Sequence, residues 1–111
     1  MEDERARELL HRERTRIERA LADAAPPEEG EYPDPSDPGD SAPATLEKEI
    51  EEGLAERLRE ELAAVERAEA RIPAGTYGLS VESGEPIPDA RLQAIPWAER
   101  TIEEQSRYDG H

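Results

Sequence analysis

The chain has 111 residues, of which 34% are hydrophobic and 39% are charged, and its formal net charge is −15 at pH 7. Because binding to nucleic acid phosphates needs a basic patch, this acidity excludes direct nucleic acid binding. The absence of cysteine excludes disulfide and thiol chemistry, and no apolar run approaches the ~18 residues of a membrane-spanning helix.

The composition also limits the kind of fold. With no Phe, one Trp and three Tyr, the chain has too little apolar surface for a compact globule of this size. An elongated helical hairpin with a thin apolar seam fits better. The acidity has two interpretations. It favours binding to a basic protein surface or to a channel that contains metal ions, or it only keeps the protein soluble. Charges from the second residue onward argue against a signal peptide, so we expect a cytoplasmic protein with no membrane association.

Residues 2–24 predict the first helix. Its apolar residues recur on one side at helical spacing, with an interruption at Glu13 and Arg14, and they are Ala6, Leu10, Ile17, Leu21 and Ala24. This stripe is narrow, so a helix of about 22 residues needs one partner helix. Six arginines share the segment. They are interpreted as solvated ion pairs with neighbouring Glu, and a partner-binding face is the alternative.

Residues 25–43 interrupt the helical pattern. They hold six of the ten prolines and six acids, with no Lys or Arg. Proline lacks a backbone donor and clashes with the preceding turn, so no helix is expected here. Clustered Pro, Gly, Asp and Ser are typical of a bend. We therefore expect two helices folded back on each other, with an acidic tip at residues 25–44.

Residues 45–72 carry the clearest periodic pattern. Apolar residues recur every three or four positions, at Leu46, Ile50, Leu54, Leu58, Leu62, Val65, Ala68 and Ile72. The pattern predicts a helix of about 28 residues, or roughly 42 Å, capped by Thr45 and ended by residues 72–75. We expect residues 1–72 to form an antiparallel coiled-coil hairpin in a mainly α fold. Gly53 indicates either close approach of the first arm or a local weakening.

Residues 73–111 differ in composition and predict a small end module. Residues 77–79 and 85–87 favour two short extended pieces around a turn. Residues 89–94 favour one or two helical turns, and residues 98–107 favour a last helix. The apolar core is expected to contain Tyr77, Leu79, Ile87, Leu92, Ile95, Trp97 and Ile102.

The motifs GTYG, GEPIP, ARL and PWA occur in this order within the end module, followed by a trailing Gln. This wording resembles the DksA/TraR family of RNA polymerase-binding regulators, closely in the end module and loosely in the whole architecture. The resemblance implies a coiled coil followed by a four-cysteine zinc finger. The positions that match the zinc ligands are Ser80, Ser83, Thr101 and Glu104.

These four residues lack the chemistry of a zinc site. Hydroxyls stay protonated near neutral pH, and one carboxylate does not replace four thiolates. We therefore expect no zinc and no other cofactor. A hydrogen-bonded cluster of the four side chains, with the apolar core around it, is predicted in its place.

The resemblance also implies a function for the bend. The family's tip carries an Asp-x-x-Asp-x-Ala pattern, which Asp37, Asp40 and Ala42 match, while a competing register begins at Asp34. It implies that the hairpin enters the secondary channel of RNA polymerase and holds these residues near the catalytic magnesium, sometimes together with the alarmone ppGpp. Apart from the resemblance, the same aspartates read as ordinary turn residues.

The sequence therefore predicts a monomeric, non-enzymatic transcription regulator that binds RNA polymerase. The alternative is an acidic adaptor that binds another protein or ribonucleoprotein complex after losing zinc. Catalysis is the weakest option, because the chain has no paired His, no Ser-His-Asp grouping and no phosphate-cradling glycine loop.

Overall fold

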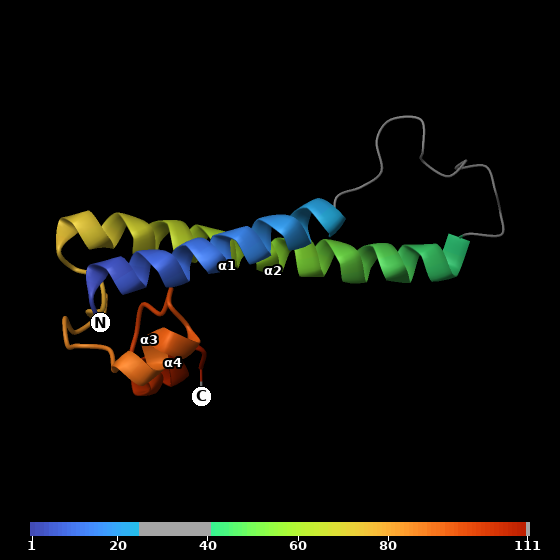
Figure 1. Ribbon diagram of the computed structural model, residues 1–111. Helices are drawn as coiled ribbons and strands as arrows, with labels where there is room; N and C mark the ends of the chain where they lie inside the picture. Colours follow the sequence, from blue (N-terminus) through green and yellow to red (C-terminus); the bar gives the residue numbers. More distant parts are fainter. Residues whose placement is uncertain (25–40, 111) are drawn as a thin grey trace.

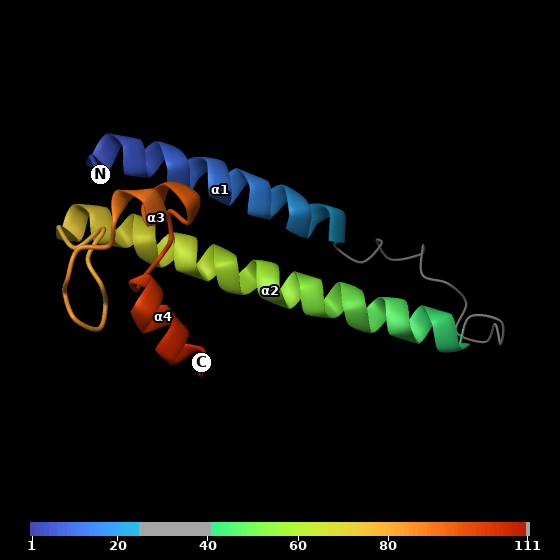
Figure 2. The same ribbon diagram turned by 90° about the horizontal axis from the view of Figure 1, so that it is seen from below.

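The computed structural model describes residues 1–24 and 41–110 as a long helical hairpin that carries a small cap near one end (Figure 1). The hairpin consists of α1 (Asp3–Ala24) and α2 (Ser41–Ala74), which lie side by side and antiparallel in both views (Figures 1 and 2). The cap, residues 75–110, contains α3 (Asp89–Ala94) and α4 (Ile102–Tyr108). This arrangement confirms the mainly α hairpin fold predicted from the sequence.

The seam of the hairpin follows the predicted periodicity. Ala6, Leu10 and Ile17 of α1 are completely buried, and they form one cluster with Leu58, Val65, Ala68 and Ile72 of α2. Glu13 and Arg14, which interrupt the apolar pattern, both form ion pairs. Arg14 pairs with Glu69 and Glu66 of α2, and Arg16 pairs with Glu13 of its own helix and with Glu61 of α2.

Helix α2 is longer than predicted. It begins at Ser41, so the expectation that no helix enters residues 41–43 is wrong, and Thr45 lies inside the helix instead of capping it. The reason is the position of Pro43, which falls in the first turn, where a helix needs no N–H from the residue. The predicted end is confirmed. Gly75 has a positive φ of 79°, and the N–H groups of Gly75 and Thr76 donate to the carbonyls of Ile72 and Arg71, which closes the helix.

The two arms differ in length, with 22 residues in α1 and 34 in α2. The first part of α2 therefore extends past the end of α1 (Figure 1). Leu46, Ile50 and Leu54, which the sequence pattern places in the seam, are exposed. A side chain at Gly53 would meet nothing within 4 Å, so close approach of the first arm at this position is also wrong.

The cap has a small apolar core. Ile87, Leu92 and Ala98 are buried together, with Met1, Tyr77 and Ile95 packed against them. Leu79 and Ile102, both expected in this core, are exposed instead. The last helix begins at Ile102 and not at Ala98, because the Thr101 side chain caps it there.

The cap packs on the end of the hairpin where α1 starts and α2 ends (Figure 1). Tyr77 and Trp97 lie against the hairpin cluster, and the Tyr77 hydroxyl donates to the Pro96 carbonyl at 2.9 Å. Helix α1 ends and helix α2 begins away from the cap, and α2 reaches further than α1 (Figure 2). Among the described helices, none combines the length and apolar character that crossing a membrane requires.

Candidate functional site

A tight turn at residues 80–85 forms the first half of the polar centre of the cap. Ser80 is buried, and its Oγ accepts hydrogen bonds from the backbone N–H of Glu82 at 3.0 Å and of Ser83 at 3.2 Å. The Ser80 N–H donates to the Glu85 carbonyl at 2.8 Å, beside an antiparallel bridge between Leu79 and Pro86. Of the two extended pieces predicted at residues 77–79 and 85–87, the structure has only this bridge between Leu79 and Pro86.

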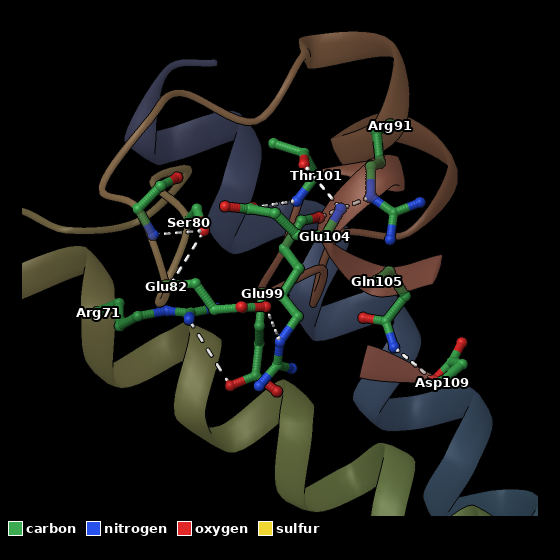
Figure 3. A network of polar contacts seen from close by, with 11 residues as sticks. Arg71, Ser80, Glu82, Arg91, Glu99, Thr101, Glu104, Gln105 and Asp109 are labelled. Atoms are coloured by element: carbon green, nitrogen blue, oxygen red, sulfur yellow. Dashed lines mark hydrogen bonds and ion pairs between the residues drawn. The ribbon is translucent and has the colours of Figure 1, made fainter. Parts of the chain in front are cut away.

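The start of α4 forms the second half. The Glu104 N–H donates to Thr101 Oγ1 at 3.2 Å, and the Thr101 N–H donates to Glu104 Oε1 at 2.9 Å. This reciprocal pair is a capping box. The Glu104 side chain points back toward the turn that carries Ser80, as Figure 3 shows, and Glu104 is buried.

Glu104 is the centre of the resulting cluster. The nearby Ser80 hydroxyl, the Thr101 backbone N–H, which donates to the carboxylate, and the Ser83 hydroxyl favour its charged form and lower the pKa of Glu104 to about 2. Donors that favour the charged form have this effect on a carboxyl group. The structure therefore brings Ser80, Ser83, Thr101 and Glu104 together around one negative charge. Part of the predicted hydrogen bonding is present, since Ser80 Oγ accepts from the Ser83 N–H and Thr101 and Glu104 bond reciprocally.

A second polar cluster joins the cap to the hairpin. Arg67 of α2 donates from Nε and Nη2 to the two carboxylate oxygens of Glu99, at 3.1 and 2.8 Å. Arg71, one turn further along, places Nη1 3.7 Å from the same carboxylate, and its Nη2 donates to the Ala98 carbonyl at 3.5 Å. Sequence reasoning missed this cluster. Two arginines four residues apart on a helix were its only signal.

Burial of the Arg71 guanidinium makes the charge balance of this second cluster important. The Nε and Nη1 atoms of Arg71 are buried without a hydrogen-bond partner, and burial lowers the pKa of the Arg71 guanidinium. The hydrogen bonds from Arg67 lower the pKa of Glu99. Glu99 is therefore held as a carboxylate, and its charge compensates the two arginines at the contact between α2 and the cap.

Of the four residues predicted at the tip, the described part of the structure contains one. Asp34, Asp37 and Asp40 lie outside the described residues, and Ala42 lies in the first turn of α2. The two helix ends that residues 25–40 connect are at the end of the hairpin away from the cap (Figure 1).

Together the fold and the polar centre define a class of protein, an antiparallel helical hairpin with a small zinc-finger-like cap. Residues 75–110 match the family model of the prokaryotic dksA/traR C4-type zinc finger. The chain belongs to the DksA/TraR family.

Two individual proteins are similar to parts of this chain. The chain is 34% identical over 74 residues to the RNA polymerase-binding transcription factor DksA of Caulobacter vibrioides, an alignment that covers 67% of this chain and 52% of that protein. It is 44% identical over 48 residues to the general stress protein 16O of Bacillus subtilis, covering 43% of this chain and 29% of that protein. The chain thus spans about half the length of the Caulobacter relative.

A solved structure extends the likeness to the whole hairpin. The transcription factor DksA2 from Pseudomonas aeruginosa superposes with a TM-score of 0.74 at 26% identity, covering 96% of this chain and 82% of that one.

The residues at the cap centre do not fit the zinc ion that the family description implies. Zinc in a structural site takes four ligands, with thiolate or imidazole preferred. Here the side chains are three hydroxyls and one carboxylate, and that carboxylate already accepts a hydrogen bond from the Thr101 N–H. Among residues 1–24 and 41–110, no group of three or more His, Cys, Asp or Glu side chains is placed to hold a metal ion.

Proposed function

We propose that this protein regulates transcription by binding RNA polymerase through its secondary channel, with the acidic tip near the polymerase active site. The Caulobacter relative is an RNA polymerase-binding transcription factor, which supports the choice of partner. The observation that carries the proposal is the geometry of the hairpin. Its 34-residue helix α2 spans roughly 51 Å, and the tip segment is attached at the end away from the cap.

The tip contributes negatively charged contact residues and no catalytic group. Asp37, Asp40 and Ala42 are the proposed contact residues, with Asp34 as the second register. Carboxylates at this point suit basic side chains and magnesium in the polymerase. The protein in this proposal is a cytoplasmic monomer that changes the activity of another enzyme and catalyses nothing itself.

The cap in this proposal folds without zinc. The Glu104 cluster and the apolar core around Leu92 take the place of the metal. Incubation with EDTA should leave the far-UV circular dichroism, the Trp97 fluorescence and the melting temperature unchanged. A large loss of structure on chelation contradicts this part of the proposal.

In vitro transcription with purified RNA polymerase tests the role of the tip. Asp40→Asn and Ala42→Thr are expected to abolish the effect on transcription while leaving the circular dichroism unchanged. Asp34→Asn separates the two registers, because it affects transcription only if the second one is used. Glu49→Gln removes a charge from an exposed position on α2 and serves as the matched control.

Binding itself is tested by co-purification with polymerase and by competition with a transcript-cleavage factor for the channel, with and without ppGpp. Failure to bind polymerase at micromolar concentration refutes the proposal. Recovery of a ribosome or another ribonucleoprotein in place of polymerase points to the acidic adaptor instead.

A further inference from the structure

One apolar surface of the hairpin has no partner in the described residues. We define the apolar stripe as Leu46, Ile50 and Leu54 of α2, whose exposed fractions are 59%, 63% and 49%. Residues four positions apart share one side of a helix, so the three side chains form a continuous row. The row lies in the first part of α2, and this helix begins beyond the end of α1 (Figure 2).

The stripe continues the seam of the hairpin. An α-helix has about 3.6 residues per turn, so residues eighteen positions apart lie on the same side after five turns. Ile50 and Leu54 are therefore in register with Ala68 and Ile72, which are buried in the cluster that α1 and α2 share. Isolated exposed apolar residues need no explanation, whereas a continuous row indicates a binding surface.

The charges beside the stripe also repeat those of the seam. Glu51 is in register with Glu69, and Glu69 pairs with Arg14 of α1. Within the described part of the chain, Glu47 and Glu51 have no ion-pair partner. Residues 46–60 contain six Glu against three Lys and Arg, so this end of α2 favours a basic occupant.

Gly53 contributes space next to the stripe. A side chain at this position would meet nothing within 4 Å, so the backbone of α2 is open to another backbone here. A glycine at this point lowers the intrinsic stability of the helix, and close approach of a second helix gives it a role.

We propose that the apolar stripe binds an amphipathic helix of a partner protein. The apolar side of the partner helix takes the place that a longer α1 would occupy. The Arg or Lys side chains of the partner helix pair with Glu47 and Glu51, as Arg14 pairs with Glu69. A second copy of this chain is a poorer occupant, because both copies carry a net charge of −15 and repel each other. The stripe contains none of the tip aspartates, and the inference does not depend on the proposed function.

A synthetic helical peptide of about 20 residues, with Leu at every third or fourth position and Arg beside them, serves as the probe. Its affinity is measured by fluorescence anisotropy at physiological salt. Replacing Leu46, Ile50 and Leu54 by Gln should weaken binding about tenfold or more. The matched control replaces Glu49, Glu52 and Glu56, on the other side of the same segment, by Gln and should weaken it less than about threefold.

Two outcomes of this titration overturn the proposal. The first is an absence of binding to the wild-type chain. The second is equal affinity for the wild type and the stripe variant, since attraction between charges alone then explains the binding. Circular dichroism verifies that both variants are folded, which is expected because all six side chains are exposed.

A labelling experiment asks whether the stripe is free in the isolated protein. Since the chain has no cysteine, Ile50→Cys and Glu52→Cys each provide a single thiol. Similar rates of reaction with DTNB support a free stripe. A rate at position 50 that is more than about tenfold slower shows that the chain covers the stripe itself, which overturns the proposal. A wild-type dimer that the stripe variant abolishes in sedimentation equilibrium also overturns it, in favour of a second copy.

Discussion

The substitution Leu92→Ala tests whether an apolar core sustains the cap. Leu92 of α3 is 2% exposed and packs with Ile87 and Ala98, so its truncation leaves a cavity that this small core has few atoms to fill. Buried Leu→Ala substitutions cost 2–5 kcal/mol, and about 3 kcal/mol is expected here. At about 1.4 kcal/mol per factor of ten, a cost of about 3 kcal/mol lowers the ratio of folded to unfolded cap roughly 140-fold, and the upper end of the range lowers it roughly 4,000-fold.

Urea unfolding followed by Trp97 fluorescence measures this change, because the only tryptophan lies between the cap and the hairpin. With a slope of about 2 kcal/mol per molar urea, the midpoint should fall by about 1.5 M. Ile102→Ala is the control, since Ile102 is largely exposed and its truncation should cost less than about 0.5 kcal/mol. If Leu92→Ala shifts the midpoint no more than this control, the apolar core does not hold the cap together.

Four other substitutions follow from the described structure. The pKa of Glu104 is about 2 in the folded protein against an ordinary 4.5, so the stability that it contributes above pH 4.5 should be lost as pH falls toward 2. An acid titration of Trp97 fluorescence should show this loss in the wild type and a flatter curve in Glu104→Gln. Glu99→Gln removes the negative charge shared by two arginines, one of them buried, and should destabilise the contact between cap and hairpin by about 2 kcal/mol in urea unfolding. Gly75→Ala should destabilise α2 by about 1 kcal/mol because φ is +79° there, whereas Gly53→Ala should stabilise it by up to about 1 kcal/mol, as thermal melts would measure.

Each of these expectations has an outcome that contradicts it. An unchanged acid transition in Glu104→Gln means that the carboxylate is not held by its hydroxyl donors. Equal stability of Glu99→Gln and the wild type means that solvent already screens the ion pairs. Destabilisation by Gly53→Ala in the isolated protein means that a second backbone approaches there.

The periodic sequence patterns predicted the hairpin well, because helices α1 and α2 depend on local information. The apolar side of each arm and the Gly that ends α2 can both be read along the chain. The start of α2 could not, since a proline in a first turn and a proline in a bend look alike in sequence. Periodicity also identifies an apolar side without saying whether a partner reaches it. Leu46, Ile50 and Leu54 are exposed because α1 is shorter than α2, and the relative length of two helices cannot be read from the pattern of either one.

The polar centre of the cap was partly predictable. The resemblance to a zinc finger placed Ser80, Ser83, Thr101 and Glu104 near each other, and their donor and acceptor groups predicted hydrogen bonds. The Thr-x-x-Glu spacing of a capping box was present at residues 101–104, and it marks the true start of α4. The Glu99 cluster depends on how the cap packs on α2, and no local pattern encodes that orientation.

The replacement of thiolates by hydroxyls and a carboxylate has a consequence for the redox chemistry of the cap. Peroxide oxidises thiolates through sulfenic to sulfonic acid, whereas serine, threonine and glutamate have no comparable reaction. With no cysteine in the chain, Met1 holds its only sulfur atom. Ser80, Ser83, Thr101 and Glu104 therefore give the cap a centre that oxidants leave chemically unaltered.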